Sequence, residues 1–197
     1  MRVLYVIACG AGPAPEVGRL VDQAQQRRWD VHLIATPAAV GFLDIGGLEA
    51  QTGHAVRSKH RRAGPGPARS LPRANAIVVA PATYNTINKW AMGVSDNYAL
   101  GILAESVGLG IPTVVLPFVN AALAAHPAFQ RSVAVLRDAR VAVVLGPGEF
   151  EPHPPGTGGD RLDSFPWHRA LDRAEALTAS EEAWSSGRGS PPDATDS

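Results

Sequence analysis

Residues 76–86 of this 197-residue chain read AIVVAPATYNT, a run of apolar residues that ends at Pro81 and leads into a polar loop. The run over 76–80 has the length and the β-branched content of a buried strand. A strand that is apolar throughout favours a parallel sheet covered by helices on both faces. Ligands bind such sheets beyond the carboxyl ends of the strands, so the loop that begins at Pro81 is a candidate site.

Further apolar runs of strand length occur at 3–8 (VLYVIA), 31–35 (VHLIA), 113–116 (TVVL) and 141–145 (VAVVL). Each ends at a turn that contains glycine or proline, and helical patterns of apolar residues follow at 15–28, 37–43 and 88–107. Strands that alternate with helices indicate a parallel sheet between two helical layers. The sequence therefore predicts an α/β fold, a Rossmann-like doubly wound parallel sheet with three αβα layers.

The composition disfavours several classes of protein. Lys plus Arg (18) equals Asp plus Glu (18), so no net charge attracts nucleic acid or an anionic membrane, and we predict neither as a partner. Cys9 is the one cysteine, which rules out an intramolecular disulfide and a multi-cysteine zinc site. The apolar run after Arg2 is shorter than a signal-peptide core or a membrane span. We expect a cytoplasmic protein.

Some segments lack the pattern of the core. Residues 57–73 (RSKHRRAGPGPARSLPR) are basic and rich in glycine and proline, which is typical of a surface excursion. Residues 146–166 show no periodicity, which in a compact domain favours a functional flap, here one that covers substrate. Residues 185–197 are rich in Ser, Gly and Pro and predict a disordered tail. We expect a single domain over 1–184.

The loops after the first two strands suggest a phosphate site. Gly10 and Gly12 begin a G-x-G pattern, but Pro15 occupies the position of the third glycine of the dinucleotide-binding motif. The pattern disfavours a dinucleotide and leaves open a single phosphate at a helix N-terminus. Thr36 has two interpretations: its hydroxyl caps the short helix that follows, or it binds the same phosphate.

The loop after the strand at 76–80 is the most informative. Thr83, Asn85 and Thr86 place two hydroxyls and one carboxamide within four residues of each other at a strand end. Such groups suit the polyol and the polar ring edge of a flavin. The loop therefore predicts a flavin site.

At this loop the chain resembles the homo-oligomeric flavin-containing cysteine decarboxylases, over most of residues 1–145. The family motif Pro-Ala-Ser-Ala-Asn-Thr is similar to 81–86, with Thr83 for Ser and Tyr84 for the second Ala, and the run NKWAMGVSDN at 88–97 is also family-like. A second motif, Pro-x-Met-Asn-x-x-Met-Trp, is similar to 117–124, which keeps the Pro and the Asn but lacks both Met and the Trp. The resemblance is closest in kind to peptidyl-cysteine decarboxylases of ribosomal peptide biosynthesis.

The resemblance implies FMN as cofactor and a homo-oligomer, a trimer or a dodecamer, in which a neighbouring subunit completes each flavin pocket. The residues implied to bind FMN are Gly10, Ala11, Thr36, Ala82, Thr83, Asn85, Thr86 and Ser95. The implied substrate is a peptide with a C-terminal cysteine, which undergoes oxidative decarboxylation to an aminoenethiol. Asn120 would hold the substrate carboxylate or amide as the catalytic residue.

Alternatives remain open at this point. One is an FMN-binding flavoprotein without decarboxylase activity, and another is phosphopantothenoylcysteine decarboxylase, which the absence of a cysteine-ligation domain disfavours. Family decarboxylases carry a histidine shortly before the third strand, and the approximate counterpart by spacing is Pro67. His54 and His60 are the nearest histidines before it, and a lone loop histidine is more often solvated than catalytic. We expect no metal, because the spacing of His153 and His168 fits no metal motif.

Overall fold

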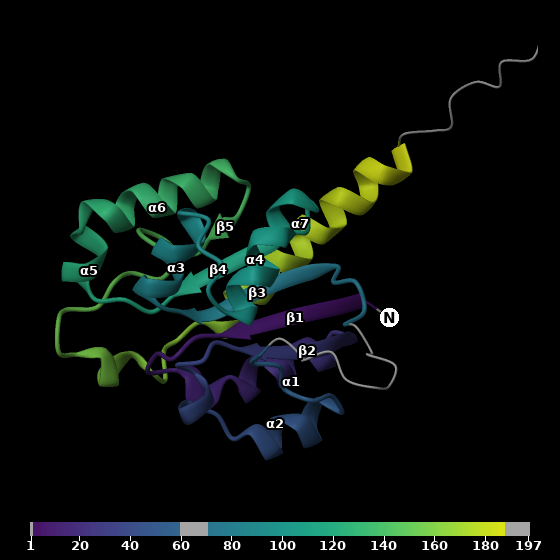
Figure 1. Ribbon diagram of the computed structural model, residues 1–197, viewed down its shortest axis with the longest axis horizontal. Helices are drawn as coiled ribbons and strands as arrows, with labels where there is room; N and C mark the ends of the chain where they lie inside the picture. Colours follow the sequence, from purple (N-terminus) through teal and green to yellow (C-terminus); the bar gives the residue numbers. More distant parts are fainter. Residues whose placement is uncertain (1, 60–70, 188–197) are drawn as a thin grey trace, which may run out of the picture.

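The computed structural model describes residues 2–59 and 71–187 and shows a parallel sheet of order β2-β1-β3-β4-β5 (Figure 1). The strands are β1 (Arg2–Ala8), β2 (Trp29–Ala35), β3 (Ala76–Ala82), β4 (Thr113–Pro117) and β5 (Ala142–Val143). The strand order changes direction between β1 and β3, which is the topological switch point of a doubly wound sheet. The predicted fold class is confirmed.

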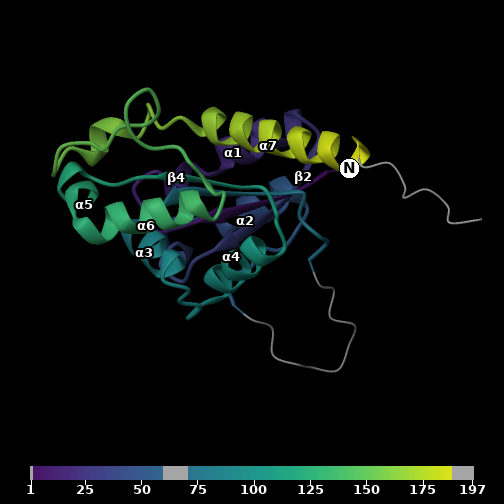
Figure 2. The same cartoon turned by 90° about the horizontal axis from the view of Figure 1, so that it is seen from above.

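Helices cover both faces of the sheet (Figure 2). One layer contains α1 (Gly18–Gln26) and α7 (Trp167–Gly187), with α2 (Ile45–Thr52) packed beside α1 and β2. The other contains α3 (Tyr84–Ala91), α4 (Tyr98–Gly108) and α6 (Pro127–Asp138), with α5 (Ala121–Ala125) leading into α6. Short 3₁₀ turns are η1 (Ala14–Glu16), η2 (Val40–Phe42) and η3 (Gly158–Arg161).

The alternation of side chains along β1 divides the core into two parts. Leu4 and Val6 pack beneath α1 and α7, whereas Tyr5 and Ile7 pack beneath α3, α4 and α6. Successive side chains of a strand point to opposite faces, so a strand that is apolar throughout must be covered twice. This double burial explains why the strand runs of the sequence are continuous rather than alternating.

The helical pattern at 88–107 was expected as one helix and forms two. Helix α3 ends at Ala91, and Gly93 follows in the left-handed conformation with a φ of 71°. The Asn97 side chain then accepts a hydrogen bond from the Leu100 amide and begins α4. The apolar spacing continues across the break because both helices cover the same face of the sheet.

The short helix expected at 37–43 is also different, since only a 3₁₀ turn forms there, at Val40–Phe42. Its N-cap is Ala39 and no side chain caps it. The interpretation of Thr36 as a helix cap is therefore wrong.

At the other edge of the sheet, β5 is shorter than the apolar run at 141–145 suggests. It covers only Ala142–Val143, because the chain turns away from its single neighbour β4 after two residues.

The segments expected outside the core take different positions. Residues 60–70, within the expected surface excursion, lie outside the described residues, as do 188–197 of the expected tail. Arg57 extends the sheet edge, because its amide donates to Leu33 and its carbonyl accepts from Ala35. Helix α7 continues to Gly187, beyond the expected domain boundary at 184.

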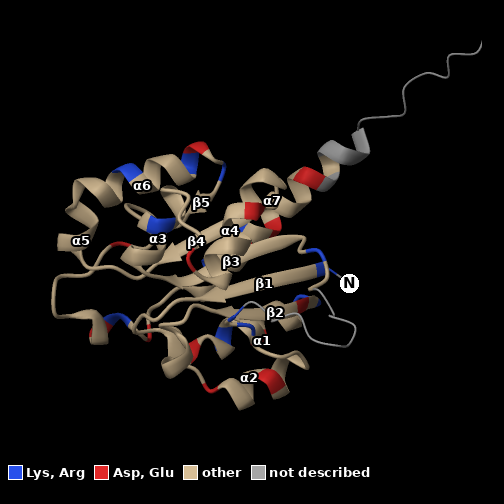
Figure 3. Ribbon diagram, in the orientation of Figure 1, with Lys and Arg blue, Asp and Glu red and all other residues tan. Residues whose placement is uncertain are grey.

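Charged side chains of both signs are interspersed over the described surface (Figure 3). The coloured residues lie mainly on the helices and loops, and few lie on the strands. Within residues 2–59 and 71–187, no helix has both the length and the apolar character needed to cross a membrane.

Candidate functional site

The carboxyl ends of β1, β2 and β3 meet the start of α3 at a cavity of about 210 Å³. The predicted cofactor residues Gly10, Thr36, Thr83, Asn85 and Thr86 all line it. The other lining residues are Pro37, Ala38, Lys89, Asp96, Asn97 and Leu100. The cavity thus brings together three loops that are far apart in the sequence, at the switch point where α/β sheets bind ligands.

Local hydrogen bonds explain how the third loop becomes a rigid wall of this cavity. The Thr83 hydroxyl accepts a hydrogen bond from the Thr86 amide at 3.2 Å and so caps α3. The two hydroxyls of Thr83 and Thr86 are also hydrogen-bonded, at 3.0 Å. Helix α3 therefore begins at the cavity wall, and a helix N-terminus carries a partial positive charge that favours an anion.

Gly10 is needed for the close approach of the first two loops. A Cβ atom at this position would lie 2.7 Å from the carbonyl oxygen of Ala38. Any larger residue would push the two loops apart and deform the cavity between them. The first loop is also tightly folded, because the Ala11 amide donates to the Cys9 carbonyl at 2.8 Å.

Thr36 supplies the clearest sign of a ligand. The residue is 5% exposed, and its hydroxyl has no hydrogen-bond partner among residues 2–59 and 71–187. A buried hydroxyl without a partner costs free energy, so such groups are normally satisfied by protein, water or ligand. Its position in the cavity fits the phosphate interpretation, and the donors and acceptors around it fit a ribityl phosphate chain.

The remaining predicted residues lie beside the cavity and do not line it. Ala82 is fully buried, and its carbonyl accepts a hydrogen bond from the Phe118 amide. Ala11 is half-buried in the first loop, and Ser95 is exposed next to the lining residue Asp96. Ala11 and Ala82 could contact a ligand through their backbone atoms. Ser95 could contact only a ligand that extends beyond the cavity.

Sequence reasoning missed Lys89 as a lining residue. Its amine forms an ion pair with Asp96, which also lines the cavity, and this hydrogen bond lowers the pKa of the Asp96 carboxyl. Lys89 lies one helical turn after Asn85, so its position on the cavity side of α3 was readable from the spacing. The pair places one positive and one negative group at the rim of the cavity.

Asn120 lies at the end of β4 and is not part of the cavity lining. It caps α5, since its side-chain oxygen accepts a hydrogen bond from the Leu123 amide at 2.9 Å. This bond fixes the orientation of the carboxamide and leaves its NH₂ group as the donor for other partners. The residue is half-buried.

Residues 146–166, the predicted flap, pack against the end of β4. The ring centroid of Phe118 lies 5.7 Å from that of Phe165, 6.4 Å from that of Phe150 and 4.9 Å from that of His153. A Cβ atom on Gly12 would lie 3.0 Å from Leu162 and 3.2 Å from Phe118. The segment is therefore held by an aromatic cluster between the first loop and the turn that carries Asn120.

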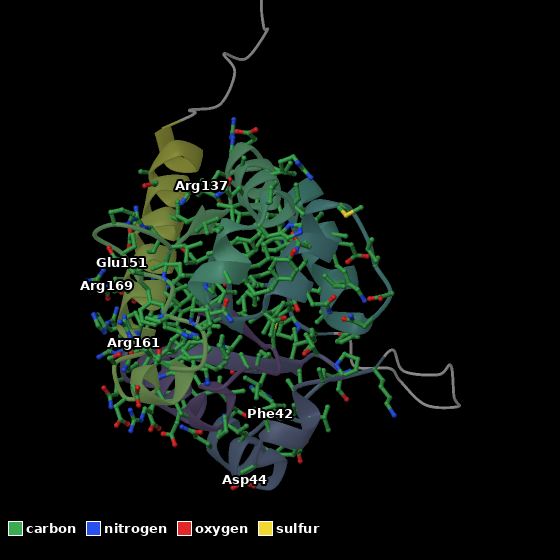
Figure 4. The ribbon with its side chains drawn as sticks, turned by 90° about the vertical axis from the view of Figure 1, so that its left-hand side faces the viewer. Phe42, Asp44, Arg137, Glu151, Arg161 and Arg169 are labelled. Carbon is green, nitrogen blue, oxygen red and sulfur yellow. The ribbon has the colours of Figure 1, made fainter. Side chains whose placement is uncertain are left out.

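Figure 4 looks onto this edge of the molecule. Glu151 and Arg161 lie on the side of segment 146–166, close in the view to Arg169 of α7, and Phe42 lies toward α2. Arg169 donates a hydrogen bond to the Gly148 carbonyl, which ties the segment to α7.

His54 does not reach the cavity. Its Nε2 atom lies 2.7 Å from Asp30 and its ring is stacked on His32, at a separate cavity beside β2. His60 lies outside the described residues. Another cavity, of about 930 Å³, is bordered by the loops that precede β4 and β5, at the amino ends of the strands, where such sheets do not bind their ligands.

A parallel sheet with a polar cavity at its switch point is the arrangement of α/β proteins that bind phosphate-bearing cofactors. The chain belongs to the Flavoprotein family, whose model matches residues 1–157. The family predicted from the motif at 81–86 is thereby confirmed.

The fold is similar to that of several decarboxylases. For the FMN-dependent cysteine decarboxylase TvaF from thioviridamide biosynthesis, the identity is 24% over 89% of this chain and 99% of that chain, with a TM-score of 0.65. For the cypemycin decarboxylase CypD, the identity is 19% over 96% of this chain and 97% of that chain, with a TM-score of 0.67. For the FMN-dependent cysteine decarboxylase SpaF, the identity is 24% over 87% of this chain and 97% of that chain, with a TM-score of 0.61.

A curated relative, a cysteine/cysteine sulfinic acid decarboxylase of an unknown prokaryotic organism, is 32% identical over 74 residues. These residues are 37% of this chain, and the match spans only 20% of the length of that relative. The family assignment therefore rests on the family model, and the fold similarity rests on the structures that match over most of their length. The curated relative adds only a local similarity.

Proposed function

We propose that the chain binds FMN at the carboxyl ends of β1, β2 and β3 and oxidatively decarboxylates the C-terminal cysteine of a peptide. The observation that carries the cofactor site is the buried Thr36 hydroxyl, which has no hydrogen-bond partner among the described residues. Leaving such a group unpaired costs about 1–3 kcal/mol, so a ligand that brings an acceptor is favoured. The Flavoprotein match and the similarity to FMN-dependent cysteine decarboxylases support the same assignment.

The residues of the cavity have distinct tasks in this proposal. Thr36 and the amino end of α3 hold the phosphate, while Thr83, Asn85 and Thr86 hydrogen-bond the ribityl chain and the ring edge. Gly10 preserves the shape of the cofactor cavity, because a Cβ atom at this position would push the first two loops apart. Bound FMN supplies the hydride acceptor for the cysteine β-carbon, and the thioaldehyde that results serves as the electron sink for loss of carbon dioxide.

Asn120 holds the substrate carboxylate through its NH₂ group. Its side-chain oxygen is bound by the Leu123 amide, so the carboxamide presents a fixed donor. A neutral donor orients the carboxylate without the strong ground-state stabilisation that a buried arginine would give. Residues 146–166, which pack on the same turn, cover the peptide tail.

The chain works in this proposal as a homo-oligomer, a trimer or a dodecamer, in which a neighbour completes the flavin pocket. Met92 is 78% exposed beside the loop between α3 and α4, and Phe42 is 46% exposed in the loop after β2. Trp90 and Leu100, on the same two helices, are by contrast buried in the core of their own chain. Light scattering of the flavin-bound protein should give a multiple of three chains, and a flavin-bound monomer would contradict the assembly.

The decisive experiment combines cofactor analysis with a peptide assay. Purified protein should be yellow and release FMN on denaturation, and it should remove carbon dioxide and two hydrogens from a synthetic peptide that ends in cysteine, as read by mass spectrometry. The same peptide ending in serine is the control and should not react. A colourless protein that does not take up FMN would contradict the cofactor site. A yellow protein that acts on no cysteine-terminated peptide would contradict the activity and favour a flavin-binding protein, with phosphopantothenoylcysteine as the next substrate to test.

A further inference from the structure

A cluster of potential metal ligands lies beside β2, away from the proposed FMN cavity. Asp30 and His32 are two residues apart on this edge strand, so their side chains point to the same face of the sheet. His54 reaches the same place from the segment after α2, which turns at Gly53 with a φ of 72°. The ligand atoms of the three side chains all lie within 4.8 Å of one another.

We propose that Asp30, His32 and His54 bind a zinc ion that ties the edge strand β2 to the segment after α2. Neither the fold comparisons nor the proposed decarboxylase activity assigns a metal to this chain, and the inference does not rest on that activity. The cavity that these three residues line, about 260 Å³, shares no lining residue with the cavity of Thr36.

The distances already approach those of a tetrahedral site. His54 Nε2 lies 2.7 Å from one oxygen of Asp30, and His32 Nε2 lies 3.4 Å from the other. Ligands bound to zinc at about 2.0–2.1 Å are about 3.3 Å apart in a tetrahedron. Rotation of the Asp30 and His54 side chains, which takes the His54 ring out of its stack on His32, would place all three donors around one ion.

His32 provides an independent sign that a partner is missing. Its side chain is 8% exposed, and Nε2 makes no aligned hydrogen bond within residues 2–59 and 71–187, although Asp30 is near. A neutral imidazole nitrogen is the form that binds zinc.

The plainer interpretation is a hydrogen-bonded Asp–His pair with a second histidine stacked on it. It accounts for His54, whose ring lies 4.0 Å from that of His32 at an angle of 17°, but it leaves the buried Nε2 of His32 without an aligned hydrogen bond within the described residues, with Asp30 3.4 Å away. A metal ion would give this nitrogen a partner, and its binding by both histidines would turn the stacked rings, because the lone pair of each Nε2 lies in the plane of its ring. Arg57 also lines the cavity, and its positive charge weakens the binding of a cation without removing any of the three ligands.

The test uses the untagged, full-length protein with its flavin. Isothermal titration with zinc chloride should show one ion per chain, and zinc should raise the melting temperature. Cobalt(II) should give the visible d–d bands of a tetrahedral site in a difference spectrum against the metal-free protein, a readout independent of turnover.

His54→Gln and Asp30→Asn should each weaken zinc binding at least tenfold and abolish the cobalt bands. Both side chains are partly exposed, so these variants are expected to fold, whereas the buried His32 is a riskier position to change. His168→Gln, which changes an exposed histidine on α7, is the matched control and should bind zinc like the wild type. Absence of stoichiometric zinc binding in the wild type, or equal binding by His54→Gln and Asp30→Asn, would overturn the site.

Discussion

The backbone of His153 pairs with that of Asn120 in a parallel β-bridge, in which the Ala121 amide donates to the His153 carbonyl at 2.8 Å. Segment 146–166 is thereby attached to the turn that carries the proposed substrate-binding side chain. A change in the position of the segment would move this turn, and the reverse also holds. Closure over a peptide and orientation of the Asn120 carboxamide are therefore expected to be coupled.

The first prediction concerns Asn120. Asn120→Ala should keep the yellow colour and lower turnover on a cysteine-terminated peptide by about tenfold to a thousandfold, which corresponds to roughly 1.4–4 kcal/mol of transition-state stabilisation. Loss of the α5 cap should also lower the free energy of unfolding by about 1 kcal/mol.

A second variant separates these two effects. Asn120→Asp keeps an oxygen for the Leu123 amide but removes the NH₂ donor and adds a negative charge. It should retain wild-type stability and still lose turnover, as measured by mass spectrometry and thermal unfolding. Wild-type turnover in both variants would show that the role assigned to Asn120 is wrong.

Thr36→Val tests the phosphate site. The hydroxyl has no partner in the described part of the chain, so replacing it with a methyl group should leave the stability of the cofactor-free protein unchanged or raise it by about 1 kcal/mol. FMN affinity should fall about tenfold, as followed by flavin fluorescence quenching, because one charge-assisted hydrogen bond contributes about 1.5–3 kcal/mol.

Thr178→Val is the matched control for this variant. Thr178 is also buried, but its hydroxyl donates to the Ala174 carbonyl within α7 at 2.8 Å. This substitution should leave FMN affinity unchanged and should not stabilise the protein. If the two variants bind FMN equally well, Thr36 does not contact the cofactor.

Phe165→Ala should release segment 146–166. The ring is 3% exposed and lies 5.3 Å from Phe150 and 4.6 Å from Trp167, measured between centroids. Removing a buried phenylalanine costs about 3–5 kcal/mol, and part of this loss should appear as local opening of the segment. Hydrogen exchange should rise over 146–166 first. Phe42→Ala, at a 46% exposed position, should leave this exchange unchanged. If hydrogen exchange rose equally over the whole chain, the aromatic cluster around Phe165 would not hold segment 146–166 independently of the rest of the fold.

Cys9 should be chemically silent in the folded protein. The thiol is fully buried at the end of β1, and burial raises its pKa above the ordinary value, so the reactive thiolate does not form near neutral pH. A thiol reagent such as iodoacetamide should label one cysteine per chain in denaturant and almost none without it. Rapid labelling of the native protein would indicate an accessible or activated thiol at the first loop.

Much of the fold follows from local pattern. The continuous apolar runs at 3–8, 31–35 and 76–80 correspond to β1, β2 and β3, because only a strand buried on both faces needs apolar residues at every position. The helix boundary at Gly93 was missed, since the apolar spacing continues through the break. The edge strand β5 was overestimated for a similar reason, as hydrophobicity reports burial and does not report pairing.

The sequence by itself determined the parallel α/β sheet, the polar loop at 81–86 and the membership in a flavoprotein family, because these depend on residues that are neighbours in the chain. Only the tertiary structure excluded the interpretation of Thr36 as a helix cap, since the alternative partners of a hydroxyl are known only once the loops are packed. It also brought His153 to Asn120 and His54 to Asp30. These contacts join segments whose separation along the chain is set by the crossovers of the sheet, and no local spacing rule encodes them.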